Sequence, residues 1–169
     1  MMAEIETSLC IFMVGIPYSG KSTFIANHPW LSGMPVVSLD DEVMTLTSGD
    51  YSRWAEVITL ANQRLEEKLN GLITQHQSFV IDKTNVSQTE RQTLIARLKS
   101  EGYQLAAIVL DVPDETVLKE RILKRTQKRI PTEVMERMKA NYYCGLDSLT
   151  DEFDSVLLVD SEGKIDLIK

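Results

Sequence analysis

The chain has 169 residues, of which 43% are hydrophobic and 25% are charged, with 18 Lys and Arg against 25 Asp and Glu. These values are typical of an ordinary globular domain and exclude a wholly disordered chain. The formal net charge of −7 disfavours a protein that coats nucleic acid without specificity or lies on an anionic membrane, because both partners would repel it on average.

Neither an internal repeat nor a linker rich in Pro, Gly or Ser interrupts the sequence, which predicts a single domain over residues 1–169. The opening residues 1–6 are acidic, whereas a secretory signal begins with basic residues. No apolar run approaches the roughly 20 residues that cross a bilayer. Cys10 and Cys144 lie far apart and are expected as reduced thiols. Together these features predict a cytoplasmic protein with no membrane partner.

Short apolar segments recur along the chain at strand length. Most of them are continuous rather than alternating, which is typical of strands in a parallel sheet that is covered on both faces. The predicted strands are residues 9–14, 36–39, 79–81, 105–110 and 156–159. Residues 164–168 are expected to add a short edge hairpin to the last strand.

Longer segments with helical spacing lie between these strands. Residues 51–72 carry apolar side chains at helical intervals, and Trp54 lies on this stripe and is expected in the core. Residues 86–100 begin with a capping-box pattern, and prolines open two further helices near residues 113 and 131. Strands that alternate with helices predict an α/β fold with an open, mostly parallel sheet of about five strands and helices on both faces.

Residues 15–22 read Gly-Ile-Pro-Tyr-Ser-Gly-Lys-Ser and match the pattern G-x-x-x-x-G-K-[ST], directly after a predicted strand and before a helix. In such a phosphate-binding loop (P-loop) the backbone N–H groups form an anion nest and the next helix adds its positive end. Lys21 is expected on the β- and γ-phosphates and Ser22 on Mg²⁺. ATP and Mg²⁺ are therefore the expected cofactors, with Gly15, Ser19, Gly20, Lys21, Ser22 and Thr23 as binding residues.

A magnesium–nucleotide site needs a second carboxylate that faces the loop from the end of a neighbouring strand. Asp82 directly follows the predicted strand 79–81, where a Walker-B-like element has its carboxylate. Asp40 and Asp41 follow another predicted strand, and one of them is expected to cap the helix that begins there. We expect Asp41 to be the cap and Asp40 to face the site.

Positive charge is concentrated between residues 119 and 139, where eight basic residues stand against three acidic ones. This segment is net +5, which leaves the remainder of the chain at −12. Arg121, Arg125 and Arg129 are spaced by four and would share one face of a helix that extends that far. Guanidinium groups suit phosphate oxygens, so the segment is predicted as a basic helical lid over the phosphates. A solvated basic helix face is the alternative.

Four stretches resemble the 5′-kinase module of polynucleotide kinases, within a wider group of small P-loop kinases that act on hydroxyl groups. They are residues 15–23, Ser-Leu-Asp-Asp (38–41), Ile-Asp-Lys-Thr-Asn (81–85) and the stretch 121–131. The resemblance implies that Asp40 is the general base on the acceptor hydroxyl and that Asp82 and Asn85 lie near the acceptor and the phosphates. It also implies that Arg121 and Arg125 touch the donor phosphates, so that Asp40, Lys21 and Arg125 form the catalytic set.

Three positions depart from the pattern of that family. Tyr18 stands where the loop usually has Gly or Ala, and Leu39 and Val43 stand where arginines often occur. The expected reaction is transfer of the γ-phosphoryl group of ATP to a hydroxyl, with the 5′-hydroxyl end of DNA or RNA ahead of a small molecule or nucleoside. A nucleotide-dependent switch or ATPase, and an ATP-binding module without turnover, are the remaining alternatives.

Overall fold

The computed structural model describes residues 7–169, and the acidic opening 1–6, which contributed to the predicted localisation, lies outside the described residues. None of the helices within that range is long and apolar enough to cross a membrane. The elements in chain order are β1 (Leu9–Val14), α1 (Lys21–Asn27), α2 (Pro29–Ser32), β2 (Val36–Ser38), α3 (Leu39–Leu46), the 3₁₀ helix η1 (Tyr51–Arg53), α4 (Trp54–Thr74), β3 (Phe79–Asp82), α5 (Gln88–Ser100), β4 (Gln104–Leu110), α6 (Glu115–Lys124), α7 (Thr132–Gly145), α8 (Leu149–Glu152), β5 (Ser155–Val159) and β6 (Ile165–Leu167).

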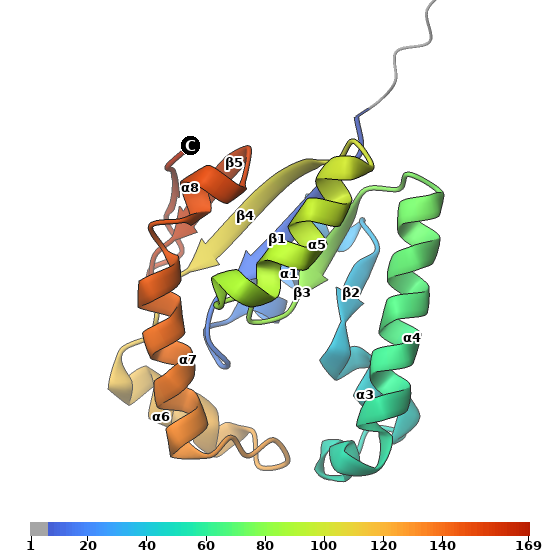
Figure 1. The fold of residues 1–169 in the computed structure, drawn as a ribbon. Coiled ribbons are helices and arrows are strands. Elements are labelled where there is room, and N and C mark those ends of the chain that lie inside the picture. The colour runs from blue at the N-terminus through green and yellow to red at the C-terminus, as the bar shows by residue number, and fades with distance from the viewer. Residues whose placement is uncertain (1–6) are drawn as a thin grey trace, which may run out of the picture.

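Between residues 7 and 169, six strands form one sheet in the order β2-β3-β1-β4-β5-β6. The first five strands in the chain run parallel, and β6 pairs antiparallel with β5 as the expected edge hairpin. The sheet confirms the predicted α/β class. Its first strand in sequence, β1, lies in the middle, between β3 and β4 (Figure 1).

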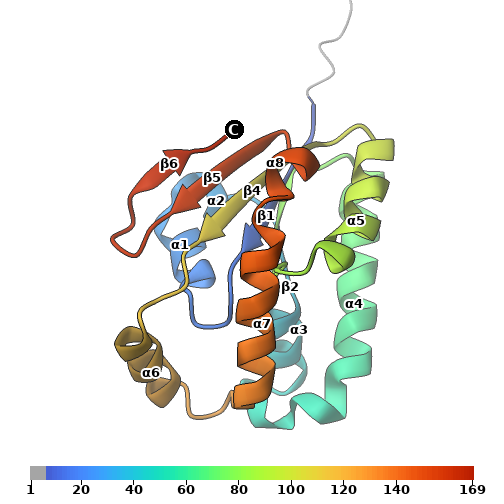
Figure 2. The same ribbon diagram turned by 60° about the vertical axis from the view of Figure 1, so that its left-hand side comes forward.

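The apolar core lies on both faces of this sheet, and alternate residues of β1 divide between the two sides. Phe12 belongs to a cluster with residues of α4 and α5, whereas Ile11 belongs to a second cluster with residues of α1 and α2. Figures 1 and 2 show these two pairs of helices on opposite faces of the sheet. Because both faces are covered, the strand is apolar throughout, which is the pattern that the sequence displayed.

The cap of α3 differs from the prediction. Strand β2 ends at Ser38, whose side-chain oxygen accepts a hydrogen bond from the backbone N–H of Asp41 at 3.3 Å. Ser38 therefore caps the helix, and the expectation that Asp41 would do so is wrong. The helix begins at Leu39 and not after Asp41, which moves Asp40 and Asp41 into its first turn, where acidic side chains stabilise the positive end of the helix.

The lid is also built differently from the prediction. Helix α6 ends at Lys124, and Arg125 has the non-helical backbone angles φ −103° and ψ 76°. Residues 125–131 are irregular until Pro131 precedes α7. The helix does not extend far enough for Arg121, Arg125 and Arg129 to share one face, so the condition for that expectation is not met. The basic segment is two helices joined by an irregular connection, which we call the lid loop (residues 125–131).

Two smaller expectations about helices fail as well. Ser87 is the N-cap residue of α5, but its side chain makes no capping hydrogen bond within the described part of the chain. Trp54 stands at the first residue of α4 and is 47% exposed, because the buried stripe of this helix begins only at Ala61. The expected place of Trp54 in the core is therefore wrong.

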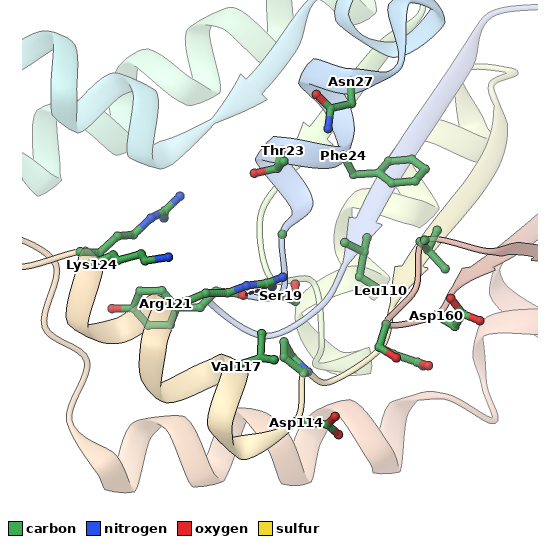
Figure 3. A pocket seen from close by; sticks show the side chains of 18 of the residues that line it. Ser19, Thr23, Phe24, Asn27, Leu110, Asp114, Val117, Arg121, Lys124 and Asp160 are labelled. Atoms are coloured by element: carbon green, nitrogen blue, oxygen red, sulfur yellow. Dashed lines mark hydrogen bonds between the residues drawn. The ribbon is translucent and has the colours of Figure 1, made fainter.

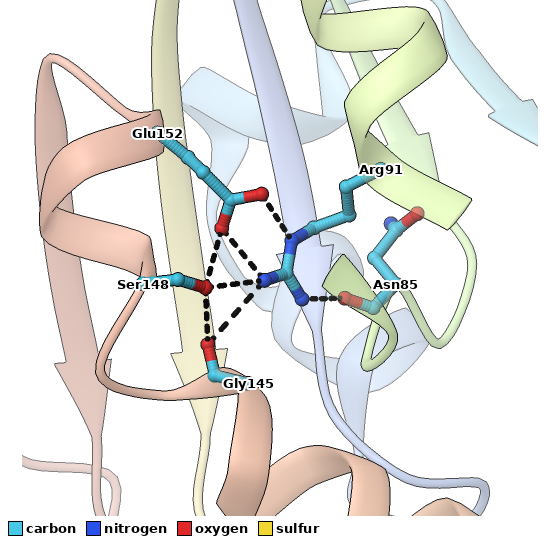
Figure 4. Close-up of polar contacts among 5 residues, drawn as sticks. All are labelled: Asn85, Arg91, Gly145, Ser148 and Glu152. Atoms are coloured by element: carbon cyan, nitrogen blue, oxygen red, sulfur yellow. Dashed lines mark hydrogen bonds and ion pairs between the residues drawn. The ribbon is translucent and has the colours of Figure 1, made fainter. Parts of the chain in front are cut away.

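A buried ion pair joins α5 to α8. Arg91 is 1% exposed, and its guanidinium donates to the carboxylate of Glu152 at 2.7 Å (Figure 4). The same guanidinium donates to the carbonyl oxygens of Asn85 at 2.7 Å and Gly145 at 3.3 Å, and to the hydroxyl of Ser148 at 3.3 Å. This network fixes the end of α7, and hence one end of the lid, against the body of the domain.

Candidate active site

The phosphate loop connects β1 to α1 and depends on its two glycines. The N–H of Gly15 donates to the carbonyl of Thr84 at 2.9 Å, which anchors the loop to the end of β3. A Cβ on Gly15 would lie 2.6 Å from the hydroxyl of Ser19. Gly20 has a φ of +101°, which side-chain-bearing residues rarely adopt. The backbone angle therefore favours glycine at position 20, and at position 15 a larger residue would displace the Ser19 hydroxyl.

Lys21 lies inside this loop. Its ammonium donates to the carbonyl oxygens of Gly15 at 2.9 Å and Ile16 at 2.8 Å, and the residue is buried. Burial lowers the pKa of Lys21 to about 8, although the nearby charge of Asp82 acts in the opposite direction. A charged donor is thus held where the motif predicts contact with phosphate oxygens.

Ser22 and Asp82 come together as the sequence predicts. The hydroxyl of Ser22 donates to Asp82 Oδ2 at 2.7 Å. Asp82 is the last residue of β3 and is paired in register with Ser38 of β2, so the ends of these two strands are adjacent. A hydroxyl and a carboxylate are ligands that suit Mg²⁺, so this pair fits the metal that the motif implies.

Asp40 projects from the first turn of α3 and is contacted from two sides. The phenol of Tyr51 donates to its Oδ1 at 2.9 Å, and the ammonium of Lys128 forms an ion pair with its Oδ2. Tyr51 comes from η1 and Lys128 from the lid loop. The negative charge of Asp40 raises the pKa of Lys21, although the burial of the ammonium, the largest influence, lowers it.

Asn85 makes structural contacts in the loop after β3. It is buried with a φ of +48°, and its amide nitrogen donates to the carbonyl of Met13 at 2.8 Å and more weakly to that of Lys83 at 3.4 Å. These bonds hold the connection between β3 and α5 against β1. The contact of Asn85 with an acceptor stays a prediction.

The two predicted lid arginines lie beside the phosphate loop. Arg121 Nη1 donates to the carbonyl of Tyr18 at 2.7 Å, and the guanidinium carbon of Arg125 lies over the Tyr18 ring, 5.9 Å from its centroid. Tyr18 has a φ of +66°, an unusual conformation for a residue of this size. Sequence reasoning noted Tyr18 only as a departure from the family pattern, and it missed Tyr51 and Lys128.

A cavity of about 500 Å³ opens beside the phosphate loop, a size suited to a small ligand. Figure 3 shows side chains of α1, among them Thr23 and Phe24, opposite side chains of α6, among them Val117 and Arg121. The cavity is lined by Tyr18, Ser19, Gly20, Thr23, Phe24, Asn27, His28, Leu110, Asp111, Pro113, Asp114, Val117, Arg121, Lys124, Arg125, Val159, Asp160, Ser161 and Gly163. Its place next to the loop fits the nucleoside part of a nucleotide whose phosphates lie in the loop.

The model of the AAA_33 family, described as an AAA domain, matches residues 10–144. The chain belongs to this family. Several solved structures share its fold at less than 25% sequence identity. A chain from the PezAT chromosomal toxin–antitoxin system of Streptococcus pneumoniae matches with a TM-score of 0.75 at 12% identity, over 97% of this chain and 72% of that one.

One further similar structure is a chain of an RNA repair complex, and another is a sugar kinase. A chain of the Pnkp1/Rnl/Hen1 RNA repair complex has a TM-score of 0.61 at 24% identity, over 96% of this chain and 49% of that one. A sugar kinase from Janibacter sp. HTCC2649 has a TM-score of 0.57 at 21% identity, over 90% of this chain and 85% of that one. These likenesses show a shared α/β fold, and the loop at residues 15–22 within it carries the motif that binds nucleotide phosphates.

Proposed function

We propose that this protein is an ATP- and Mg²⁺-dependent kinase that transfers the γ-phosphoryl group to a hydroxyl acceptor, with the 5′-hydroxyl end of DNA or RNA as the first candidate. One observation carries the proposal. A P-loop lysine, the Ser22–Asp82 pair and the Asp40 carboxylate lie at the carboxyl ends of three adjacent strands, next to cations of the lid. That edge of an open α/β sheet is where ligands bind.

In the proposed reaction, different residues bind the metal, stabilise the phosphoryl charge and accept the proton. Ser22 and Asp82 would hold Mg²⁺, which supplies positive charge to the β- and γ-phosphates when it is bound. Lys21, Arg121 and Arg125 offset the charge of the transferring group. Asp40 accepts the proton of the acceptor hydroxyl while the acceptor oxygen bonds to the γ-phosphorus and the bond to the ADP oxygen breaks. Because a carboxylate is a weak base, positioning and electrostatics carry most of the rate.

Two classes of acceptor compete within this proposal. The basic segment 119–139 and the fold shared with a chain of an RNA repair complex favour a nucleic acid end. The net charge of −7 and the apolar residues at positions 39 and 43, of which Val43 is fully buried, favour a small hydroxyl compound. An ATPase without an acceptor is less favoured, because Lys83, and not an acidic residue that would polarise water, follows Asp82.

Asp40→Asn tests the proposed base. We expect this variant to keep its affinity for Mg²⁺-ATP, measured by calorimetry, while turnover falls at least about 10²-fold, as is typical when a general base is lost. Glu42→Gln, on the same helical turn but without a role in the proposed site, serves as the matched control and should leave turnover unchanged. An undiminished rate for Asp40→Asn would refute the assignment of the base.

Incubation with γ-labelled ATP and separate acceptors identifies the substrate. The panel holds 5′-hydroxyl oligonucleotides of DNA and of RNA, nucleosides, sugars and a sample without acceptor. Label on oligonucleotides supports the first candidate, and label on small molecules alone replaces it with the second. Release of free phosphate alone in every sample would overturn the kinase proposal.

We also propose a cytoplasmic location, which the free thiols of Cys10 and Cys144 support.

A further inference from the structure

Each oxygen of the Asp40 carboxylate has a hydrogen-bond donor from a different part of the chain. Tyr51 donates to Oδ1 at 2.9 Å, and the Lys128 ammonium contacts Oδ2. The proposed base must direct one of these oxygens at the acceptor hydroxyl. Each of these oxygens keeps a second lone pair, but an acceptor hydroxyl that approaches either of them competes with the donor already there.

Lys128 is the donor that can be exchanged. Tyr51 belongs to η1, which packs against α3 and continues directly into the 21-residue helix α4. Burial, followed by the charge of Asp40, raises the pKa of Tyr51, so that its phenol keeps its proton and remains a donor. Lys128 instead belongs to the irregular lid loop, most of which is exposed. Such a segment can shift without unwinding a helix.

Tyr18 connects the phosphate loop to Lys128. Its phenol donates to the backbone carbonyl of Lys128 at 2.7 Å, and its own carbonyl accepts from Arg121. The Lys128 ammonium also lies over the ring of Tyr51, 5.0 Å from its centroid. A continuous chain of contacts thus runs from the phosphate loop through the lid loop to Asp40 and Tyr51.

We propose that Tyr18, Tyr51 and Lys128 are positioning residues that guard the base. Tyr51 orients the Asp40 carboxylate throughout the cycle, while Lys128, held in place by Tyr18, occupies Oδ2 until an acceptor hydroxyl displaces it. Without an acceptor, water has to compete with this charged donor for Oδ2 of Asp40, so the transfer of phosphoryl groups to water stays low. The inference rests on the proposed function, because it assumes that Asp40 is the base.

The first test measures phosphate release from Mg²⁺-ATP without any acceptor. Lys128→Met should raise this rate about three- to fivefold, which corresponds to the loss of a partly exposed ion pair. Lys128→Arg keeps the cation and should restore a low rate. Lys119→Met removes a lysine from exposed α6, where its only ion pair among the described residues is a weak contact with Glu115, and should change nothing. An unchanged or lower rate in Lys128→Met overturns the guarding role.

The second test needs neither an acceptor nor turnover. Tyr18→Phe and Asp40→Asn each remove one attachment of the lid loop, so trypsin should cleave both variants faster than the wild type after Arg125 and Arg129. Tyr143→Phe, which alters an exposed tyrosine on α7, is the control and should be cleaved like the wild type. Equal cleavage of all four proteins would overturn the inferred attachment of the lid loop.

The two tests separate failure of the inference from failure of the proposed function. Faster trypsin cleavage of Tyr18→Phe and Asp40→Asn, together with increased phosphate release by Lys128→Met, supports the inference. Faster cleavage without increased release shows an attached lid that does not guard Asp40, and it rejects the inference while the kinase proposal stands. If no protein transfers phosphoryl groups to any acceptor or to water, the proposed function fails, and the guarding role fails with it.

Discussion

The buried ammonium of Lys21 makes nucleotide binding dependent on pH. Burial lowers the pKa of this group to about 8, so near pH 8 a substantial fraction of the molecules carries a neutral amine. A bound triphosphate stabilises the charged form and raises the pKa again. ATP binding at pH 8 should therefore take up protons, and the affinity should fall as the pH rises through 8.

Calorimetry in two buffers with different ionisation enthalpies measures this proton uptake. The apparent binding enthalpy should differ between the buffers for the wild type at pH 8 and agree at pH 6, where Lys21 is already charged. Lys21→Met removes the titrating group, so its weaker binding should show no difference at either pH. A binding enthalpy for the wild type that is independent of the buffer at pH 8 would contradict the expected shift.

At the level of single residues, the sequence predicted the part of the site that follows from fixed spacing. Lys21, Ser22 and Asp82 come together because each stands at a strand end or in the loop beside it, and the strand order brings those ends to one edge. Tyr51 and Lys128 had no such signal. Their contacts with Asp40 join segments that are distant in the chain and, for Lys128, irregular, so no local pattern indicates them.

The contact between α7 and the loop before α5 sets a limit on the residue at position 145. Gly145 ends α7, and a Cβ there would lie 2.6 Å from the carbonyl oxygen of Val86, a backbone atom that cannot move freely. Gly145→Ala should therefore destabilise the fold by about 1–3 kcal/mol, as overpacking does. Gly71→Ala, inside α4 with open space around the added carbon, should instead stabilise by about 0.5–1 kcal/mol.

Urea denaturation of both variants and the wild type measures these changes in the free energy of unfolding. The opposite signs expected for the same substitution make the pair informative. If both variants lose stability equally, the close approach of α7 to residue 86 is not a structural restraint.

The ion pair between α5 and α8 leads to a second prediction about elements. Arg91→Met leaves the buried carboxylate of Glu152 without its partner and should cost about 3–5 kcal/mol of stability. The double variant Arg91→Met, Glu152→Met removes both charges and should recover much of this loss. Thermal or urea unfolding of the three proteins tests the expectation, and a double variant less stable than Arg91→Met would contradict it.

The predictions of element boundaries succeeded where apolar residues mark the boundaries, and they failed where charged residues dominate. The strands follow their continuous apolar runs closely, because burial on both faces requires such runs. Helix α6 ends sooner than its arginine spacing indicated. Arginine and lysine favour helices, but beyond Leu123, which is itself 76% exposed, the segment has little apolar surface to pack, and Pro131 disfavours a helical Ile130.

Across the whole molecule, the site has two sides that meet at the phosphate loop. The cavity beside α1 and α6 occupies one side, and Asp40 with α3 occupies the other, while the lid loop contacts both through Tyr18 and Lys128. Figure 2 shows α6 and α7 extending together beyond the sheet edge. The sequence predicted a lid there, but the cavity joins segments near residues 23, 117 and 160, and no single motif spans them.

The central place of β1 affects how the chain is made. Leu9–Val14 leaves the ribosome before the other described strands, yet both of its neighbouring strands begin after residue 78, and the anchor of the phosphate loop at Thr84 is equally late. An apolar strand therefore stays without sheet partners for several seconds of translation, at about 5–20 residues per second. During that interval the nascent chain offers a binding segment to chaperones and cannot yet hold a nucleotide.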